Sequence, residues 1–244
     1  MESVKNHYDR FLGSVYSWIL GDFEKAADRS TEFFDSLDLR PGSGAIAVDL
    51  GSGPGCQSIP LARQGFDVLA VDFCQPLLDE LSAHAGDLPI RTVCDDIARF
   101  DQYLSAPADL IVCMGDTLVH LPDENAVDAL LDSVCAALKP GGRFIYAIRD
   151  YHTTVPEGAD RFVPIRSSDD RIFTCFLDYD DESVHVHDLL HTRVDGEWTL
   201  SISDYRKLRL SCESIDARLA AGGCPVARSV PLDGMITGIA RKGA

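Results

Sequence analysis

Five short apolar runs alternate with helix-length segments between residues 45 and 148, and this alternation constrains the fold more than any other feature. The runs read AIAVDL, DVLAVD, PIRTVC, DLIVCM and RFIYAI. Runs this short and this rich in β-branched residues are typical of strands that are covered on both faces. Such strands separated by helices form a parallel sheet, so the pattern predicts an α/β fold with helices on both faces.

Two of the segments between these runs carry clear helix signals. The stretch IPLARQG ends at Gly65, and residues 124–142 space their apolar side chains at three and four before a Lys-Pro-Gly-Gly stop. The second of these helices leads into the fifth predicted strand.

The rest of the chain divides into three parts around a core at residues 45–150. Residues 1–44 carry aromatic side chains at helical spacing and predict an N-terminal helical cap. Residues 151–210 contain strand-like runs without helices and an Asp-Gly turn at 195, which indicates an antiparallel β insert after strand five. Residues 211–244 predict a last helix and two antiparallel terminal strands, giving seven strands in all. We expect one domain over residues 1–244.

Composition excludes several classes of protein. The chain has 22 Lys and Arg against 39 Asp and Glu, a net charge of −17, which repels nucleic acid. No apolar run approaches the roughly 20 residues that span a bilayer, and the N-terminus lacks the apolar core of a signal peptide. The eight cysteines show no CxxC spacing. We therefore expect a cytoplasmic protein with no membrane or nucleic-acid partner.

The glycine-rich loop VDLGSGPG after the first strand indicates the kind of cofactor. Dinucleotide-binding loops read G-x-G-x-x-G, but here the third position is Cys56. An acid at Asp49, near the end of the strand, would repel a pyrophosphate and attract an ammonium group. S-adenosylmethionine (SAM) offers that ammonium group and no phosphate.

On these residues the chain resembles the class I SAM-dependent methyltransferases, because VDLGSGPG is similar to their motif I. The resemblance covers residues 45–150 and implies a Rossmann-like, mostly parallel sheet, SAM as cofactor and S-adenosylhomocysteine as product. It implies that Asp72, 21 residues beyond Gly51, accepts the ribose hydroxyls. It also implies that Asp96 takes the adenine amine. The cofactor residues predicted in this way are Asp49, Gly51, Gly53, Gly55, Asp72, Phe73, Asp96, Ile97 and Met114.

The acceptor should lie at the loops after strands four and five, because ligands of open α/β sheets bind beyond the carboxyl ends of the strands. These loops, MGDTLVHL and RDYHTTV, resemble those of the glycine and sarcosine N-methyltransferases. The resemblance implies that Arg149 holds a carboxylate of the acceptor. The chain departs from that pattern with Asp116 and Asp150 where the relatives carry amides, which predicts a more cationic acceptor.

Four residues are therefore candidates for the acceptor site, each with an alternative. Arg149 either grips the acceptor or pairs with Asp150 or another acid of the insert. His120 either acts as a base or caps a helix, and Asp116 either faces the acceptor or turns the loop. His120, Asp116 and Tyr151 are the three possible bases. A base is needed only if the acceptor is protonated at working pH.

The predicted function is methyl transfer to a nitrogen or oxygen of a small amine, amino acid or related metabolite. A non-catalytic SAM-binding module and a protein methyltransferase are the alternatives. A nicotinamide reductase is disfavoured because no Tyr-x-x-x-Lys pair is present. A methyltransferase that modifies nucleic-acid bases is disfavoured because no Asn/Asp-Pro-Pro-aromatic motif follows strand four.

His185, His187 and His191 share one parity along a strand and would either bind a metal or form a solvated face. We expect no metal. The sequence leaves the oligomeric state open.

Overall fold

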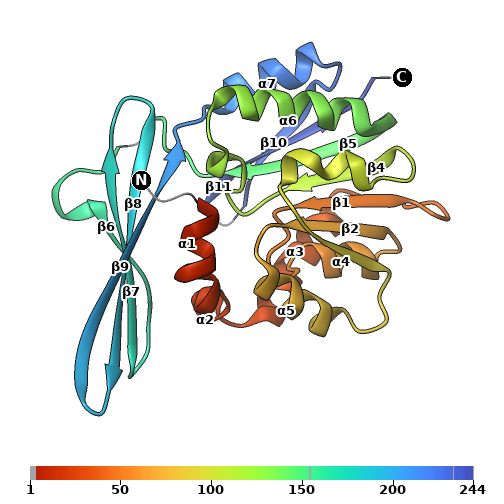
Figure 1. The fold of residues 1–244 in the computed structure, drawn as a ribbon. Coiled ribbons are helices and arrows are strands. Elements are labelled where there is room, and N and C mark those ends of the chain that lie inside the picture. Colours follow the sequence, from red (N-terminus) through yellow and green to blue (C-terminus); the bar gives the residue numbers. More distant parts are fainter. Residues whose placement is uncertain (1–3, 154, 233, 244) are drawn as a thin grey trace.

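The computed structural model describes residues 4–153, 155–232 and 234–243, and a seven-stranded sheet lies at its centre (Figure 1). The strand order is β10-β11-β5-β4-β1-β2-β3, with β1 to β5 parallel and β11 antiparallel to both β5 and β10. The strands are β1 Ile46–Leu50, β2 Asp67–Asp72, β3 Ile90–Cys94, β4 Ala108–Cys113, β5 Leu138–Ile148, β10 Val226–Leu232 and β11 Met235–Arg241. The predicted fold class and the antiparallel terminal pair are confirmed.

Helices cover both faces of this sheet, as alternate side chains of β5 demonstrate. Phe144 and Tyr146 pack under α6 and α7, whereas Ile145 and Ala147 pack against α3 and α4. The helices of the core are α4 Ser58–Arg63, α5 Gln75–Ala85, α6 Glu124–Ala137 and α7 Cys212–Ala221, with 3₁₀ helices η2 Ile97–Tyr103 and η3 Leu118–His120. The sheet is therefore apolar on both sides, which is why its strands read as continuous apolar runs.

The end of α6 differs in one detail from the expected Lys-Pro-Gly-Gly stop. The helix ends at Ala137, and the four residues of the stop lie within the bounds of β5. The pairing with β4 shifts there, from Ala108 opposite Leu138 to Leu110 opposite Arg143. The extra residues on β5 form a bulge, so the segment both ends the helix and begins the strand.

From residue 4 on, the N-terminal segment forms four helices, of which the first ones lie between the central sheet and a second sheet and α3 covers one face of the central sheet. They are α1 Val4–Arg10, η1 Leu12–Ser14, α2 Tyr16–Leu20 and α3 Phe23–Ser36. On α1, the ring of His7 stacks on that of Tyr205 in the second sheet, with the ring centroids 4.3 Å apart. The ring of Tyr8 contacts that of Phe73 in the core edge to face, with the centroids 5.3 Å apart. The cap therefore connects the two sheets.

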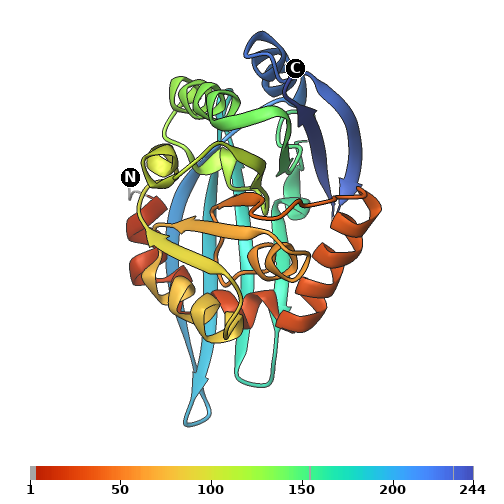
Figure 2. The same cartoon turned by 90° about the vertical axis from the view of Figure 1, so that its right-hand side faces the viewer.

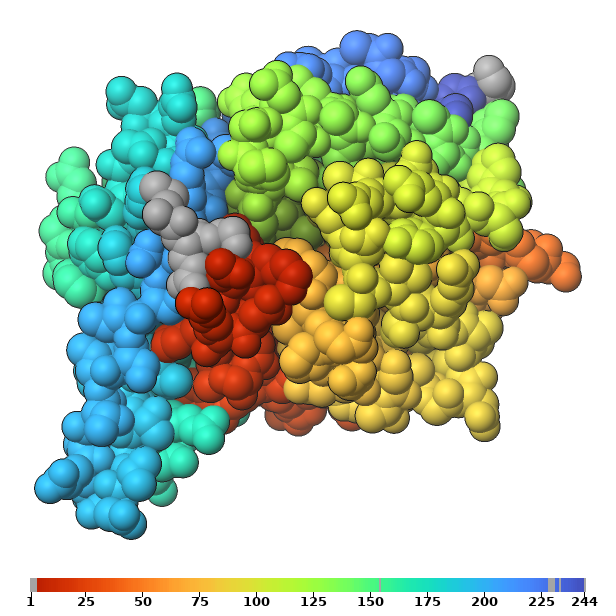
Figure 3. Space-filling view, viewed as in Figure 1, coloured from red at the N-terminus to blue at the C-terminus, as the bar shows by residue number. Residues whose placement is uncertain are grey.

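The second sheet is antiparallel and has the order β6-β7-β8-β9. Its strands are β6 Phe162–Ser167, β7 Arg171–Tyr179, β8 Ser183–Val194 and β9 Glu197–Leu208, with a 3₁₀ helix η4 at Gly158–Arg161. Positive φ angles at Asp195 (53°) and Gly196 (88°) form the predicted hairpin turn. The strands of this sheet run across the end of the central sheet (Figure 2), and the β8–β9 hairpin projects from the body (Figure 3).

The three histidines of β8 (His185, His187 and His191) lie on one face of this sheet. Their paired neighbours on β9, on the same face, are Arg206, Asp204 and Leu200. His185 lies 3.4 Å from Asp180. Within the described ranges, no group of three or more His, Cys, Asp and Glu side chains is placed to hold a metal ion. None of the helices in that part of the chain has the length and apolar character needed to cross a membrane.

Candidate functional site

A cavity of about 840 Å³ opens at the carboxyl ends of β1, β2, β4 and β5, under α1 and α2. The strand order reverses between β1 and β4, and such a reversal is where open α/β sheets bind ligands. The volume lies within the range of small-molecule sites.

The structure brings most of the predicted site residues to the wall of this cavity and places four behind it. The residues on the wall are Gly51, Gly53, Asp72, Phe73, Asp96, Ile97, Met114, His120 and Arg149. Those that do not line it are Asp49, Gly55, Asp116 and Tyr151. Contact of any of these side chains with a bound molecule stays a prediction.

The glycine loop approaches its neighbours too closely for larger residues. Gly51 has φ = 75°, and a Cβ atom there would lie 2.5 Å from Thr117 Cγ2. A Cβ atom on Gly55 would lie 2.8 Å from Leu81 Cγ. Glycine is therefore needed at both positions, and its absence of a side chain leaves the backbone of the loop open to the cavity.

Asp72 lies at the end of β2 and is held by the loop. Its two oxygens accept hydrogen bonds of 2.8 Å from the backbone N–H groups of Gly53 and Cys74. Burial raises the pKa of Asp72, and these hydrogen bonds oppose that shift. The carboxylate retains lone pairs that can accept further hydrogen bonds from a ligand on the cavity side.

The two adjacent acids after β3 differ in their partners. Asp95 accepts a 2.6 Å hydrogen bond from Tyr103 Oη, whereas Asp96 caps η2 by accepting from Ala98 N at 2.9 Å. Both line the cavity, but only Asp96 is exposed. Its position agrees with the predicted role at the adenine, which stays a prediction.

Asp49 lies beneath the glycine loop and is 1% exposed. One of its oxygens accepts a 2.6 Å hydrogen bond from Ser58 Oγ at the start of α4. Burial raises the pKa of Asp49 to about 7, despite this hydrogen bond. Any attraction between Asp49 and an ammonium group would act through the loop above it.

Asp116 is the centre of a buried polar cluster that includes a residue sequence reasoning missed. Lys207, on β9, donates to Asp116 Oδ2 at 2.7 Å, and Tyr151 Oη donates to the same oxygen at 2.9 Å. The backbone N–H of Arg149 donates to Asp116 Oδ1 at 2.9 Å. Asp116 has φ = 72°, so it turns the loop as well as binding Lys207. We call Asp116, Tyr151 and Lys207 the buried cluster.

The charges within the buried cluster compensate each other. Burial alone would raise the pKa of Asp116, but the charge of Lys207 and the hydrogen bonds hold it below its ordinary value. Burial alone would lower the pKa of Lys207, and Asp116 raises it well above the ordinary range. Asp116 is 3% exposed and turned away from the cavity. The argument that this acid attracts a cationic acceptor is therefore wrong, because its charge is already neutralised inside the protein.

The signal for Lys207 in the sequence is weak. It shares a parity with Tyr205 on β9, and both side chains are buried. A single lysine in a strand with many polar residues gives no indication that it pairs with Asp116, which lies on a loop 91 residues earlier in the chain.

His120 lies at the end of η3 and faces the cavity. Its Nδ1 atom is buried and lacks a hydrogen-bond partner within the described part of the chain. Its ring stacks on Tyr205 at 5.5 Å. Burial and the charge of Lys207 lower the pKa of His120 to about 3, so the ring is neutral at working pH. A base this weak does not retain a proton taken from an ammonium group, although it can accept a hydrogen bond.

Arg149 has an exposed side chain on the cavity wall. Asp150, its suggested partner, instead accepts hydrogen bonds from the backbone N–H groups of His152 and Thr153 at 3.0 and 2.9 Å. Among the residues described, no acid forms an ion pair with the Arg149 guanidinium. Its charge is therefore available to a bound molecule.

Residues 47–142 match the model of a family described as a methyltransferase domain. This segment is therefore similar to methyltransferase domains. It contains the glycine loop, Asp72 and Asp96, and thus the wall predicted to hold the cofactor.

Individual relatives agree with this assignment. The ubiquinone biosynthesis O-methyltransferase of Xylella fastidiosa (strain 9a5c) is 39% identical over 106 residues, 42% of this chain and 41% of that protein. The glycine/sarcosine N-methyltransferase of Aphanothece halophytica is 30% identical over 158 residues, 63% of this chain and 59% of that protein. The chain spans about half the length of the curated relatives it matches.

Likeness to solved structures extends over the whole chain. An amino pentose methyltransferase from Micromonospora echinaspora, solved with SAM bound, matches with a TM-score of 0.75 at 18% identity and covers 99% of both chains. At this identity the likeness concerns the fold. The predicted resemblance to class I methyltransferases and the Rossmann-like architecture are confirmed.

Proposed function

We propose that this protein is a SAM-dependent methyltransferase that methylates an amine nitrogen of a small molecule. The observation that carries the proposal is the cavity at the strand reversal of a methyltransferase domain, with Asp72 and Asp96 on one side and Arg149 on the other. The sequence relatives named above include both an N- and an O-methyltransferase.

The residues of the cofactor side fit SAM. Asp72 and Asp96 present carboxylates to the cavity, and the glycine loop leaves its backbone accessible. Ser52 Oγ is buried in this loop and has no hydrogen-bond partner in the described ranges, as expected of an atom that awaits a ligand. Burial raises the pKa of Asp49, beneath the loop, to about 7, and an ammonium group bound above the loop would favour its ionised form.

Methyl transfer from SAM would be an in-line displacement: the acceptor's lone pair forms a bond to the methyl carbon as the carbon–sulfur bond breaks. S-adenosylhomocysteine leaves as a neutral thioether, and the positive charge passes from sulfur to the acceptor nitrogen. The protein then needs mainly to align the acceptor and exclude water. The helices α1 and α2 line the cavity and would exclude water from it. His120 is neutral and would accept a hydrogen bond from the acceptor amine, which fixes its lone pair without removing a proton.

This arrangement favours a neutral amine as the reactive form of the acceptor. Tyr151 and Asp116 are occupied with Lys207 and do not reach the cavity, so neither replaces His120 as a base. An amine that arrives protonated must lose its proton to water first. The rate should therefore rise with pH until the acceptor's own amine is deprotonated.

The direct test is methyl transfer by the purified full chain with SAM and a panel of primary and secondary amines. S-adenosylhomocysteine release and a mass increase of the acceptor would support the proposal. Binding of S-adenosylhomocysteine without turnover of any amine, hydroxyl compound or peptide would indicate a non-catalytic SAM-binding module. Transfer only to protein side chains would indicate a protein methyltransferase.

A further inference from the structure

Strand β9 of the second sheet has one edge with which no strand of the described chain pairs. It is the last strand in the order β6-β7-β8-β9 and is hydrogen-bonded to β8 alone. Its carboxyl half is covered by α1, where His7 stacks on Tyr205 and lies 2.7 Å from Ser203 Oγ. Residues 197–202, by contrast, are all exposed and lie in the hairpin that projects from the body (Figure 3). The backbone groups along this edge are therefore available to a strand of another chain.

The exposed part of β9 is apolar on one face and carries no charge on the other. Trp198, Leu200 and Ile202 alternate along it and are 44%, 49% and 58% exposed. Small polar residues stand between them, so the run WTLSIS at 198–203 contains neither a charged residue nor a proline. Edge strands are usually protected from pairing by charges, prolines or bulges. The pairing of β9 with β8 continues in one register from end to end, so no bulge provides that protection.

The opposite edge of the same sheet has the protection that β9 lacks. Strand β6 contains Pro164, and its pairing with β7 shifts register between Pro164 and Arg166. A proline removes a backbone donor, and a bulge bends the strand away from a flat partner. The chain thus blocks pairing at one edge of this sheet and permits it at the other.

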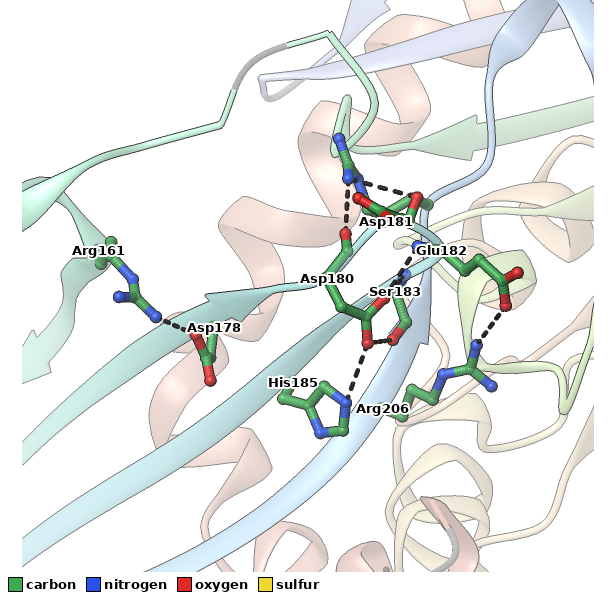
Figure 4. Close-up of polar contacts among 9 residues, drawn as sticks. Arg161, Asp178, Asp180, Asp181, Glu182, Ser183, His185 and Arg206 are labelled. Carbon is green, nitrogen blue, oxygen red and sulfur yellow. Dashed lines mark hydrogen bonds and ion pairs between the residues drawn. The ribbon is translucent and has the colours of Figure 1, made fainter.

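Charged side chains flank the run and do not interrupt it. At the body end of the sheet they pair with one another, as Glu182 does with Arg206 at 4.0 Å (Figure 4). At the hairpin end, Arg193 lies over the ring of Trp198, with its Cζ atom 5.9 Å from the ring centroid. The run is bracketed by two acids, Glu197 and Asp204. A strand that pairs with the run itself meets no charge.

We propose that β9 pairs antiparallel with β9 of a second copy of this chain, about a two-fold axis at Leu200. Leu200 then lies opposite its own counterpart, and Trp198 of each copy lies opposite Ile202 of the other. The apolar stripe continues from one copy to the other, and the two antiparallel sheets become one. A shift by two residues in either direction would place Trp198 opposite Asp204 or Ile202 opposite Gly196. The pattern of the run therefore favours this register over its neighbours.

The size of the interface predicts a dimer that dissociates reversibly. Three half-exposed side chains of these types present roughly 250 Å² of apolar surface. With about 57% of an interface apolar, each copy would bury roughly 450 Å². A standard interface buries about 800 Å² per partner, so we expect a Kd in the micromolar range. Each copy has a net charge of −17, so added salt should strengthen the association by screening repulsion. This pairing is independent of what the cavity binds.

The first test is sedimentation velocity of the full chain at concentrations from about 1 to 200 µM and at about 0.05 and 0.5 M NaCl. We expect a reversible equilibrium between monomer and dimer, with the lower Kd at the higher salt. Leu200→Lys places two like charges opposite each other and should raise Kd at least about tenfold. Ile172→Lys is the matched control and should leave Kd unchanged, because Ile172 lies on the same exposed face but on β7, away from the edge.

Two outcomes of this experiment would overturn the proposal. One is a monomer at every concentration and salt, which would leave the edge to a strand of a different protein. The other is an equal loss in both variants, which would indicate that the two sheets stack face to face.

The second test places a cysteine on the proposed axis. Opposite Cα atoms of an antiparallel pair lie about 4.5–5.5 Å apart, within the range that a disulfide bridges. Leu200→Cys, treated with oxidised glutathione at a concentration where the dimer forms, should therefore give a covalent dimer on a non-reducing gel. Val194→Cys is the control, because Val194 is exposed at the hairpin tip and its two copies would lie far apart. The unaltered chain, in which Cys94 is exposed, gives the background. Equal cross-linking of the two variants, or none for Leu200→Cys, would refute the proposed pairing.

Discussion

Replacing Lys207 by methionine should show how much the second sheet, through this side chain, contributes to the stability of the loop after β4. The substitution keeps most of the apolar stem but removes the charge that lies 2.7 Å from Asp116 Oδ2. Asp116 is then buried without a counter-charge and keeps only the hydrogen bonds from Tyr151 and Arg149. Removing one partner of a buried ion pair typically costs about 3–5 kcal/mol.

Protonation of Asp116 limits this cost and gives it a pH dependence. Keeping an aspartic acid protonated at pH 7 costs about 4 kcal/mol, since each pH unit above its ordinary pKa of about 3.9 adds about 1.4 kcal/mol. In the unaltered protein the pKa of Asp116 is lowered, so the stability from its ionised form is present at neutral pH. The variant should therefore lose about 3–4 kcal/mol at pH 7 but only about 1.5 kcal/mol at pH 5.

Urea unfolding at pH 5, 6 and 7 measures this difference directly. The matched control is Lys139→Met, because Lys139 also lies 2.7 Å from an aspartate, Asp109, but the two side chains are 39% and 34% exposed. The control should lose less than about 1 kcal/mol. The double variant Lys207→Met with Asp116→Asn should recover to within about 1 kcal/mol of the unaltered protein, because no buried charge remains.

Two results would refute this reasoning. One is a loss for Lys207→Met that equals the control, and the other is a large loss that does not change between pH 5 and 7. A further readout separates the electrostatic role from a purely structural one. Because Lys207 contributes to the low pKa of His120, that pKa should rise from about 3 in the variant, which NMR titration of the imidazole can follow.

Three further predictions concern the cofactor side. Asp72→Ala should weaken S-adenosylhomocysteine binding by about 30- to 150-fold, or 2–3 kcal/mol, in calorimetry, and unchanged affinity would remove Asp72 from the site. Asp49→Asn should be more stable than the unaltered protein at pH 8 by up to about 4 kcal/mol. The reason is that the folded protein keeps the Asp49 proton between pH 3.8 and about 7 while the unfolded chain releases it, so stability falls with pH across that window. A pH-independent difference between the two proteins would contradict this. Gly51→Ala should lower both stability and SAM affinity, because φ = 75° and the contact with Thr117 both oppose a side chain. A variant with the Tm and SAM affinity of the unaltered protein would show that the loop can shift.

Most of the fold could be predicted from local patterns. The runs that predicted β1 to β5 lie within a residue or two of the observed strands at their carboxyl ends, and the hairpin turn lies at Asp195 as expected. Local patterns suffice here because strand burial, helix ends and turns each depend on residues a few positions apart. The exception is the Lys-Pro-Gly-Gly stop, which forms the bulged start of β5 where the pairing with β4 shifts.

By itself, the sequence determined the α/β core, the glycine loop and the positions of Asp72 and Asp96. These features depend on the backbone conformation of short segments, which residues a few positions apart decide. Only the tertiary structure decided the electrostatic state of the acceptor side. Asp116 was predicted to present a charge to the acceptor, but Lys207, 91 residues later, neutralises it. The neutrality of His120 and the place of Arg206 on the cavity wall depend on the same long-range packing. The pKa and the electrostatic effect of a side chain depend on its burial and on the charges and hydrogen bonds around it. Here segments far apart in the chain provide those neighbours.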